Sequence, residues 1–151
     1  MKDRINSGHN IPLIGSFAIS TDKDRLDIAA IHDYLSHRSY WAQGRTIEAV
    51  QKSIDNSLCF GVYDEDDNFA GFARVVTDYV VFAYLLDLFI LEQYRKQGVG
   101  KSLVDHIINS PMLQDVRWRL DTQDAHELYR KFGFEEPIFP KKIMEKRKVQ
   151  K

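Results

Sequence analysis

The sequence has a single cysteine and no long apolar run, and each of these features excludes a class of protein. Its single cysteine, Cys59, cannot form an internal disulfide, which excludes a small domain stapled by disulfides. The opening stretch "MKDRINSGHN" has no apolar segment of the kind that a signal peptide needs, so we expect a reducing, cytoplasmic setting. No apolar run is long enough to cross a bilayer, so we expect no association with a membrane.

The sequence also lacks an excess of charge of one sign. Its 21 Lys and Arg residues nearly balance its 22 Asp and Glu residues, which leaves a formal net charge of -1. No global field therefore favours nucleic acid or acidic lipid as a partner, and the basic tail from Lys141 to Lys151 is only a weak sign of a nucleic-acid module. His32, His37 and His126 are too scattered for the spacing of metal ligands, so we expect no metal.

What the sequence does have is enough apolar material for one domain. With 151 residues, 44% of them hydrophobic, the chain can bury a sizeable core, so we predict a single domain over residues 1–151 with frayed ends at 1–10 and 142–151. Cys59 lies on an apolar strand and no histidine arrangement supports a thiol nucleophile, so packing is its expected role.

Periodicity and turn residues predict alternating helices and strands. The predicted elements, in chain order, are a strand at Leu13–Ser20, a helix from a cap at Thr21 or Asp24 to about His37, a short helix capped by Thr46, strands at Leu58–Tyr63, Phe69–Thr77 and Val80–Leu91, a helix ended by Pro111, a strand at Val116–Asp121, a helix stopped by Gly133, and one closing strand. Because Val80–Leu91 is apolar nearly throughout, we expect it at the centre of the sheet, buried on both faces. This order predicts an α/β domain with a mixed sheet.

The turn after that central strand reads Arg95-Lys96-Gln97-Gly98-Val99-Gly100-Lys101. The amino end of a helix exposes unpaired N–H groups and attracts phosphate, most of all where glycine lets the ligand approach the backbone. Arg95, Lys96 and Lys101 would add mobile cations. Two glycines alone would equally suit a tight strand-to-helix turn with a solvated rim. A P-loop is excluded, because no G-x-x-x-x-G-K-[ST] occurs.

Two motifs make the chain resemble the GNAT superfamily of acyl-CoA-dependent N-acetyltransferases. Arg95 to Gly100 matches that family's R/Q-x-x-G-x-G/A pyrophosphate loop, and Ala125-x-x-x-Tyr129-x-x-x-Gly133-Phe134 looks like its second segment. The sequence departs from the family at Glu92, where proline is frequent, and at Thr122, where asparagine is frequent. The resemblance implies a mixed, mostly antiparallel central sheet of about six to seven strands, about four flanking helices, and a V-shaped splay between the fourth and fifth strands.

The resemblance also implies acetyl-CoA as co-substrate. Its pantetheine arm would pair with the exposed edge of the central strand and its diphosphate would sit on the glycine turn. The positions implied for coenzyme binding are Leu88, Phe89, Ile90, Leu91, Arg95, Lys96, Gln97, Gly98, Val99, Gly100, Lys101, Ser102, Thr122, Ala125 and Tyr129. A main-chain N–H beside Ile90 and Leu91 would hold the thioester oxygen.

Catalysis would need an acid and a base. Tyr129 matches the family's general acid, although its stripe position alone favours a core aromatic. Asp87 and then Glu92 are the candidate bases. A paired structural carboxylate at Asp87, with water as the base, is an equal alternative. Tyr40, Trp41 and Tyr84 are the candidates for lining the acceptor pocket.

The sequence therefore predicts an enzyme that moves an acetyl group from acetyl-CoA to a primary amine by direct attack in a ternary complex. The alternative is a GNAT-fold module that binds an acyl-CoA and catalyses nothing. The partner would be a small-molecule or peptide amine, and polyamine, aminoglycoside, amino acid and protein amino terminus all remain open. We expect no nucleic acid, no metal, and a monomer or a homodimer.

Overall fold

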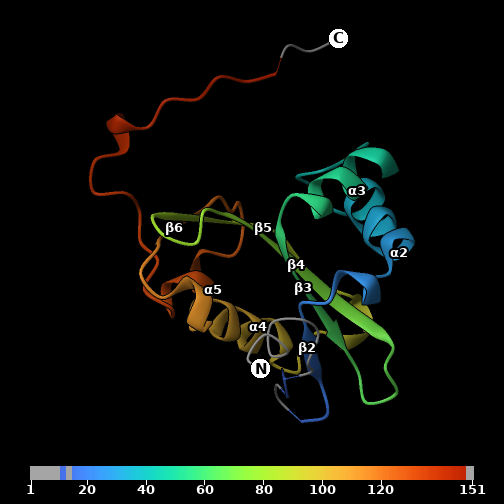
Figure 1. The fold of residues 1–151 in the computed structure, drawn as a ribbon. Helices are drawn as coiled ribbons and strands as arrows, with labels where there is room; N and C mark the ends of the chain where they lie inside the picture. The colour runs from blue at the N-terminus through green and yellow to red at the C-terminus, as the bar shows by residue number, and fades with distance from the viewer. Residues whose placement is uncertain (1–10, 13–14, 149–151) are drawn as a thin grey trace. The chain divides into compact units, whose positions relative to one another are not determined.

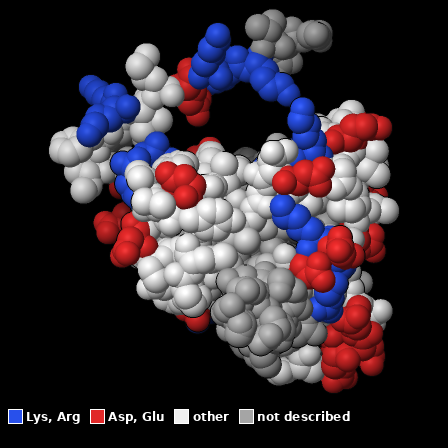
Figure 2. Space-filling model, in the orientation of Figure 1, with Lys and Arg blue, Asp and Glu red and all other residues white. Residues whose placement is uncertain are grey.

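The computed structural model describes residues 11–12 and 15–148. This part of the chain divides into two compact units, the first ending at Asp121 and the second beginning at Thr122. The expectation of a single domain stays a prediction. None of the helices in the described residues is long and apolar enough to cross a membrane. Basic and acidic side chains are interspersed over the face that Figure 2 shows.

The first unit is built on one mixed sheet (Figure 1). Its strands are β1 (Ile11–Pro12), β2 (Ala18–Ser20), β3 (Leu58–Tyr63), β4 (Phe69–Thr77), β5 (Phe82–Ile90) and β6 (Arg117–Leu120). They lie side by side in chain order, antiparallel except for the parallel pair β5 and β6. The mixed, mostly antiparallel sheet is therefore as the sequence predicted.

Aspartates form the turns of the two long hairpins. In the β3–β4 turn the Asp64 carboxylate accepts the N–H groups of Asp66 and Asn68 at 2.9 and 2.8 Å, and the bond from Asn68 contributes most to holding the pKa of Asp64 below its ordinary value. In the β4–β5 turn the Asp78 carboxylate accepts three successive N–H groups, which likewise lowers the pKa of Asp78. Side-chain acceptors thus replace the ladder bonds that the chain loses in each turn.

Helices cover both faces of this sheet (Figure 1). α2 (Ile28–Asp33), which continues into a π-helical turn at Tyr34–Arg38, and α3 (Ile47–Asp55) lie on one face, and α4 (Val99–Ile108) lies on the other. Thr46 caps α3 as predicted, since its side chain accepts the N–H of Ala49 at 3.1 Å. The predicted cap at Thr21 or Asp24 is wrong, because Asp27 caps α2 instead.

Aromatic rings fill the space between the sheet and the helices. The ring of Phe89 stacks on Tyr34 with centroids 4.0 Å apart, on the face that α2 and α3 cover. On the α4 face Phe60 meets His106 edge-on, and burial lowers the pKa of that histidine. A fully buried phenylalanine such as Phe60 contributes about 2 to 3 kcal/mol through the hydrophobic effect. The core therefore fixes the sheet against helices on both sides.

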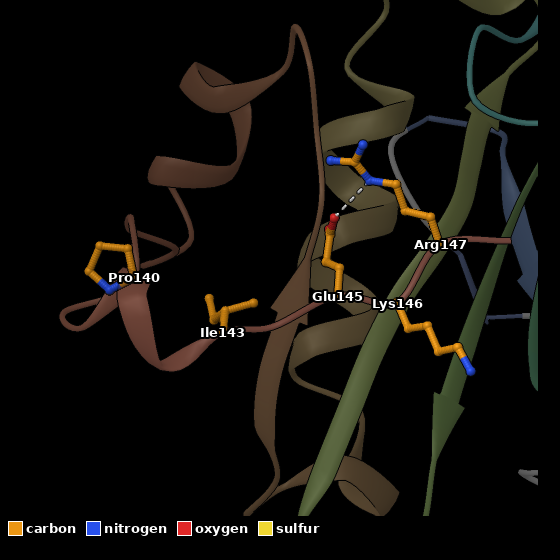
Figure 3. Close-up of a pocket in the computed structure, with 5 residues that line it drawn as sticks. All are labelled: Pro140, Ile143, Glu145, Lys146 and Arg147. Carbon is orange, nitrogen blue, oxygen red and sulfur yellow. Dashed lines mark ion pairs between the residues drawn. The ribbon is translucent and has the colours of Figure 1, made fainter. Parts of the chain in front are cut away.

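The second unit contains α5 (His126–Arg130) and a 3-10 turn at Pro140–Lys142. Gly133 has a φ of 90° just after α5, as predicted for the residue that stops this helix. Further along, Figure 3 shows a shallow pocket that only exposed side chains line, Pro140, Ile143, Glu145, Lys146 and Arg147. None of the candidate site residues belongs to it.

The expected count of about six to seven strands is not matched. The described residues form five strands of three residues or more, and β1 adds only a two-residue pair. The closing strand predicted after Gly133 is absent between that residue and Lys148. Pro137 and Pro140 interrupt this segment and remove two N–H donors, which is unfavourable for a sheet ladder. The expected number of about four α-helices agrees with α2, α3, α4 and α5.

Candidate active site

One edge of β5 is open over its second half. β6 pairs with β5 only from Phe82 to Leu85, and β5 continues to Ile90. Among the described residues, no strand therefore pairs with this edge between Leu86 and Ile90. The open edge lies where the sequence predicts the fourth and fifth strands to splay apart.

A bulge lies within the same stretch of β5. Phe72 pairs with Phe89 and Arg74 pairs with Leu86, so two residues of β5, Asp87 and Leu88, oppose the single residue between them on β4. Asp87 has a φ of 54°, a left-handed conformation that non-glycine residues rarely adopt. A bulge bends its strand and re-aims side chains, so the backbone here is set differently from that of a regular strand.

The backbone groups at the end of β5 can be assigned to one side or the other. The N–H of Leu91 donates to the carbonyl of Ala70 at 2.9 Å, so it points toward β4. Because successive N–H groups of a strand point to opposite edges, the N–H of Ile90 points toward the open side. Of the two residues expected to hold a thioester oxygen, Ile90 therefore has the better-placed donor.

The amino end of α4 adjoins this edge. Gly98 precedes the helix with a φ of 81° and a ψ of 6°, and no side chain caps the helix. The first backbone bond runs from Ser102 N–H to the Gly98 carbonyl at 3.0 Å, so the N–H groups of Val99, Gly100 and Lys101 have no partner within the helix. A Cβ placed on Gly100 would lie 3.6 Å from Cγ1 of Ile90, which shows how closely the helix end approaches β5.

The three cations of the glycine turn differ in their freedom. The Arg95 guanidinium donates from Nε to the Ile90 carbonyl at 2.9 Å and from Nη2 to the Tyr34 hydroxyl at 2.6 Å. Arg95 is therefore held against the end of β5. The sequence had led us to expect a mobile cation here. Lys96 and Lys101 are exposed. Unpaired N–H groups beside two exposed lysines suit a diphosphate, so the residues present fit the coenzyme that the motif implies.

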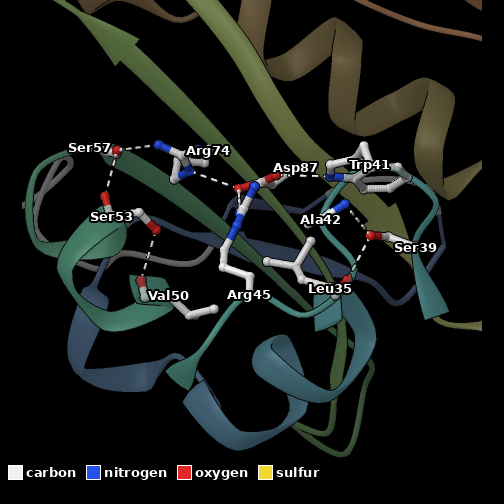
Figure 4. A network of polar contacts seen from close by, with 10 residues as sticks. All are labelled: Leu35, Ser39, Trp41, Ala42, Arg45, Val50, Ser53, Ser57, Arg74 and Asp87. Atoms are coloured by element: carbon white, nitrogen blue, oxygen red, sulfur yellow. Dashed lines mark hydrogen bonds and ion pairs between the residues drawn. The ribbon is translucent and has the colours of Figure 1, made fainter. Parts of the chain in front are cut away.

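The Asp87 side chain, only 1% exposed, is the centre of a polar network (Figure 4). Its Oδ1 accepts the indole N–H of Trp41 at 2.9 Å. Its Oδ2 accepts Nη1 of Arg45 at 2.8 Å and Nε of Arg74 at 2.9 Å. Donors from other residues thus occupy both oxygens of this carboxylate, so the geometry favours the paired structural carboxylate over the general base.

Two of those donors come from the segment Ser39–Arg45, which joins the π-helical turn to α3. The buried Ser39 hydroxyl fixes the start of this segment, since its Oγ donates to the Leu35 carbonyl at 2.7 Å and accepts the Ala42 N–H at 3.0 Å (Figure 4). Tyr40 and Trp41 meet edge to face, with ring centroids 5.1 Å apart, and both are more than a third exposed. The segment therefore presents aromatic surface while Asp87 anchors it to β5.

The remaining candidates of the first unit have partners of their own. Oε1 of Glu92 accepts Nη1 of Arg38 at 2.9 Å, and both side chains are largely solvated. The Tyr84 hydroxyl donates to the Asp121 carboxylate at 2.5 Å. Burial raises the pKa of the Cys59 thiol to about 11, which supports the packing role expected of this residue.

Two candidates, Thr122 and Tyr129, lie in the second unit. Oγ1 of Thr122 accepts the N–H of Ala125 at 3.0 Å, just before α5 begins. Tyr129 lies on α5, and its ring meets Phe134 edge-on at 5.8 Å. Within this unit the motif residues are thus held by local contacts.

No role was predicted from the sequence for Arg45 and Arg74, the two cations that hold Asp87. Arg74 had a detectable signal, because a single charge within the apolar strand "FAGFARVV" usually needs a buried partner. Arg45 had none, since it stands in a polar connection before a helix cap. The network could not have been assembled without the spatial pairing of that connection with β5.

Comparisons with known proteins agree with the motifs. A family model described as the acetyltransferase (GNAT) domain matches residues 55–136. A solved structure from Xanthomonas campestris, assigned to the GNAT family, is 43% identical with a TM-score of 0.85, over 88% of this chain and 94% of that one. A Gibberella zeae protein named as an acetyltransferase is 28% identical over 65% of each chain. A Prochlorococcus marinus protein, named as an uncharacterised N-acetyltransferase, is 38% identical over 46% of this chain. The matched regions span only 65% and 41% of the lengths of these last two relatives.

Proposed function

Because the chain belongs to the GNAT family of acetyltransferases, we propose that it transfers an acetyl group from acetyl-CoA to a primary amine within a ternary complex. The observation that carries this proposal is how near the amino end of α4 lies to the end of β5 that β6 leaves open, since a Cβ placed on Gly100 would lie 3.6 Å from Cγ1 of Ile90. A coenzyme with a diphosphate and an amide-rich arm needs both surfaces side by side.

The chain's residues would bind and orient the two substrates. The free N–H groups of Val99, Gly100 and Lys101 would hold the diphosphate, and the open edge from Leu88 to Ile90 would pair with the arm. The coenzyme supplies an activated thioester. The Ile90 N–H would donate to its carbonyl oxygen and stabilise the negative charge that develops there when the amine attacks.

Two protons must move during the reaction. An amine with a lysine-like pKa is almost all ammonium at pH 7, so making it nucleophilic costs about 4.6 kcal/mol. Since cations pair with both candidate carboxylates, Asp87 and Glu92, we assign this proton to a water held by backbone carbonyls. The amine nitrogen then bonds to the carbonyl carbon, the carbon–sulfur bond breaks, and Tyr129 protonates the leaving thiolate. The role of Tyr129 rests on the family motif.

Measuring thiol release from acetyl-CoA over a panel of primary amines tests this function. Tyr129→Phe should slow release with the best amine by about tenfold or more while acetyl-CoA still binds. Tyr79→Phe is the matched control, because Tyr79 is half exposed at the β4–β5 turn, away from the open edge of β5. An unchanged rate in Tyr129→Phe would remove the assigned acid. Coenzyme binding without release for any amine would favour the non-catalytic module.

A further inference from the structure

The network around Asp87 carries more positive charge than it neutralises. Two guanidinium groups, those of Arg45 and Arg74, contact a single carboxylate oxygen, and the third donor, the Trp41 indole, is neutral. The three charged groups therefore leave one net positive charge in a largely buried place. Excess charge that is shielded from water attracts a counter-ion strongly, because low dielectric strengthens the interaction.

Arg45 is the member of the network that can still bind a ligand. Only its Nη1 bonds to another described residue, at Asp87. No buried side-chain nitrogen or oxygen lacks a partner anywhere in the described residues, so Nε and Nη2 of Arg45 reach solvent. A quarter of the side chain is exposed, which agrees with one edge being bound and the other open. An open guanidinium edge presents two parallel N–H groups, the geometry that matches a carboxylate.

The surroundings of Arg45 indicate what else the ligand carries. Trp41 bonds to the same carboxylate as Arg45, and its ring meets Tyr40 edge-on with both rings partly exposed. An aromatic surface next to an arginine edge suits a molecule with an apolar body and an anionic end. Asp87 is also three residues before Ile90 on β5. A strand rises about 3.3 Å per residue, so the cluster lies within the length of a small molecule from the proposed oxyanion donor.

The acidic turn Asp64–Asp67 is the feature that would instead favour a polycation, but two of its four acidic side chains have local partners. Asp64 accepts from Asn68 and from the Tyr94 hydroxyl, and Asp67 is paired with Arg25. This turn therefore has less free charge than its composition indicates. Within the network around Asp87, the open charge is the positive edge of Arg45.

We propose that the acceptor is an amine that also carries a carboxylate, that Arg45 binds this carboxylate through its open edge, and that Asp87 is the positioning residue that fixes Arg45 for it. This inference rests on the proposed acetyl transfer and narrows its acceptor from any primary amine to amino acids and related amino carboxylates. Polyamines and aminoglycosides, which have no carboxylate, would be poor substrates.

The test compares amines in pairs that differ only by the carboxylate. L-phenylalanine and 2-phenylethylamine form one pair, and L-lysine and 1,5-diaminopentane form another. Thiol release from acetyl-CoA should give a kcat/KM about tenfold or more higher for the carboxylate-bearing member of the preferred pair, as expected for a charge-assisted hydrogen bond. Equal or lower kcat/KM for the carboxylate-bearing member in both pairs would overturn the inference.

Variants locate the effect at Arg45. Arg45→Gln should raise KM for the carboxylate-bearing amine about tenfold or more. The KM for the amine of the same pair that lacks the carboxylate should not change. Arg45→Lys keeps the positive charge but loses the two parallel N–H groups of the guanidinium, so it should give an intermediate KM. This variant replaces the glutamine variant in the test if the latter fails to fold. Arg25→Gln is the matched control, because Arg25 is paired with Asp67 and its side chain is 23% exposed against 25% for Arg45.

The possible results distinguish a failure of the carboxylate site from a failure of the proposed acetyl transfer. If both members of each pair lose activity equally in Arg45→Gln, the arginine supports the fold and the carboxylate site is refuted. If the enzyme acetylates amines with no regard to the carboxylate, the inference fails while acetyl transfer stands. If no amine releases thiol and acetyl-CoA does not bind, the proposed function fails first.

Discussion

Replacing Gly98 by alanine tests whether the amino end of α4 is the diphosphate site. Gly98 has a φ of 81°, so any L-residue there must adopt the left-handed conformation or force the loop to move. The cost for alanine is about 1 to 2 kcal/mol. Either the folded state retains the conformation and loses that stability, or the loop relaxes and the N–H groups of Val99 and Gly100 shift.

Only the second response weakens coenzyme binding, because a relaxed loop must return to its present form to bind. A penalty of about 1 to 2 kcal/mol corresponds to a rise in the acetyl-CoA dissociation constant of about fivefold to thirtyfold. Isothermal titration calorimetry measures this change directly. Urea unfolding of the same protein measures how much of the penalty falls on stability.

Gly100→Ala, two residues further along in the first turn of α4, is the matched control. Gly100 is not one of the described glycines that have a positive φ. The Cβ of an alanine there would meet only Cγ1 of Ile90, at an ordinary contact distance of 3.6 Å. Alanine within a helix is also favoured over glycine by about 0.5 to 1 kcal/mol. This variant should bind acetyl-CoA about as well as wild type. Wild-type affinity in Gly98→Ala without a loss of stability in urea, or an equal loss of affinity in both variants, would refute the assignment of the loop.

Three further predictions concern single side chains of the first unit. Asp87→Asn should destabilise the fold by about 3 kcal/mol in urea unfolding, because it leaves two partly buried guanidiniums without their counter-charge; a change below 1 kcal/mol would mean that the ion pairs contribute little. Cys59, whose pKa burial raises to about 11, should react with a thiol reagent only after unfolding, and rapid labelling of the native protein would contradict its burial. Burial lowers the pKa of His106 below its usual 6.5, so the unfolded chain takes up this proton first as pH falls. Stability should therefore drop between pH 7 and 5.5, and His106→Gln should reduce that drop; an equal drop in the variant would contradict the prediction.

Much of the fold could be predicted because local signals and burial agree. The strands β3 and β4 were predicted with the bounds that the structure has, since apolar runs flank an aspartate-rich turn. The cap at Thr46 and the stop at Gly133 were also correct, because each depends on one residue and its immediate neighbours. Such signals need no knowledge of distant contacts.

The errors fall where a distant contact or a subtle backbone preference decides. The first helix was predicted as one element, but its turn at Tyr34–Arg38 is π-helical, and the stacking of Tyr34 on Phe89 is a contact that no local pattern encodes. Arg95 was predicted as a mobile cation, yet it bonds to Tyr34 and the Ile90 carbonyl. The closing strand was predicted on apolar residues that Pro137 and Pro140 interrupt.

The bulge at Asp87 explains why one residue can affect both substrates. In a regular antiparallel strand one residue opposes one residue, and an extra residue shifts the backbone by one position relative to its neighbour. The shift at Asp87 re-aims its carboxylate to meet Arg45 and also sets which N–H groups of the following stretch point to the open edge. The acceptor side and the coenzyme side of the proposed site therefore share one backbone irregularity. A change that straightens β5 would disturb both, whereas a change confined to Arg45 would disturb only the acceptor.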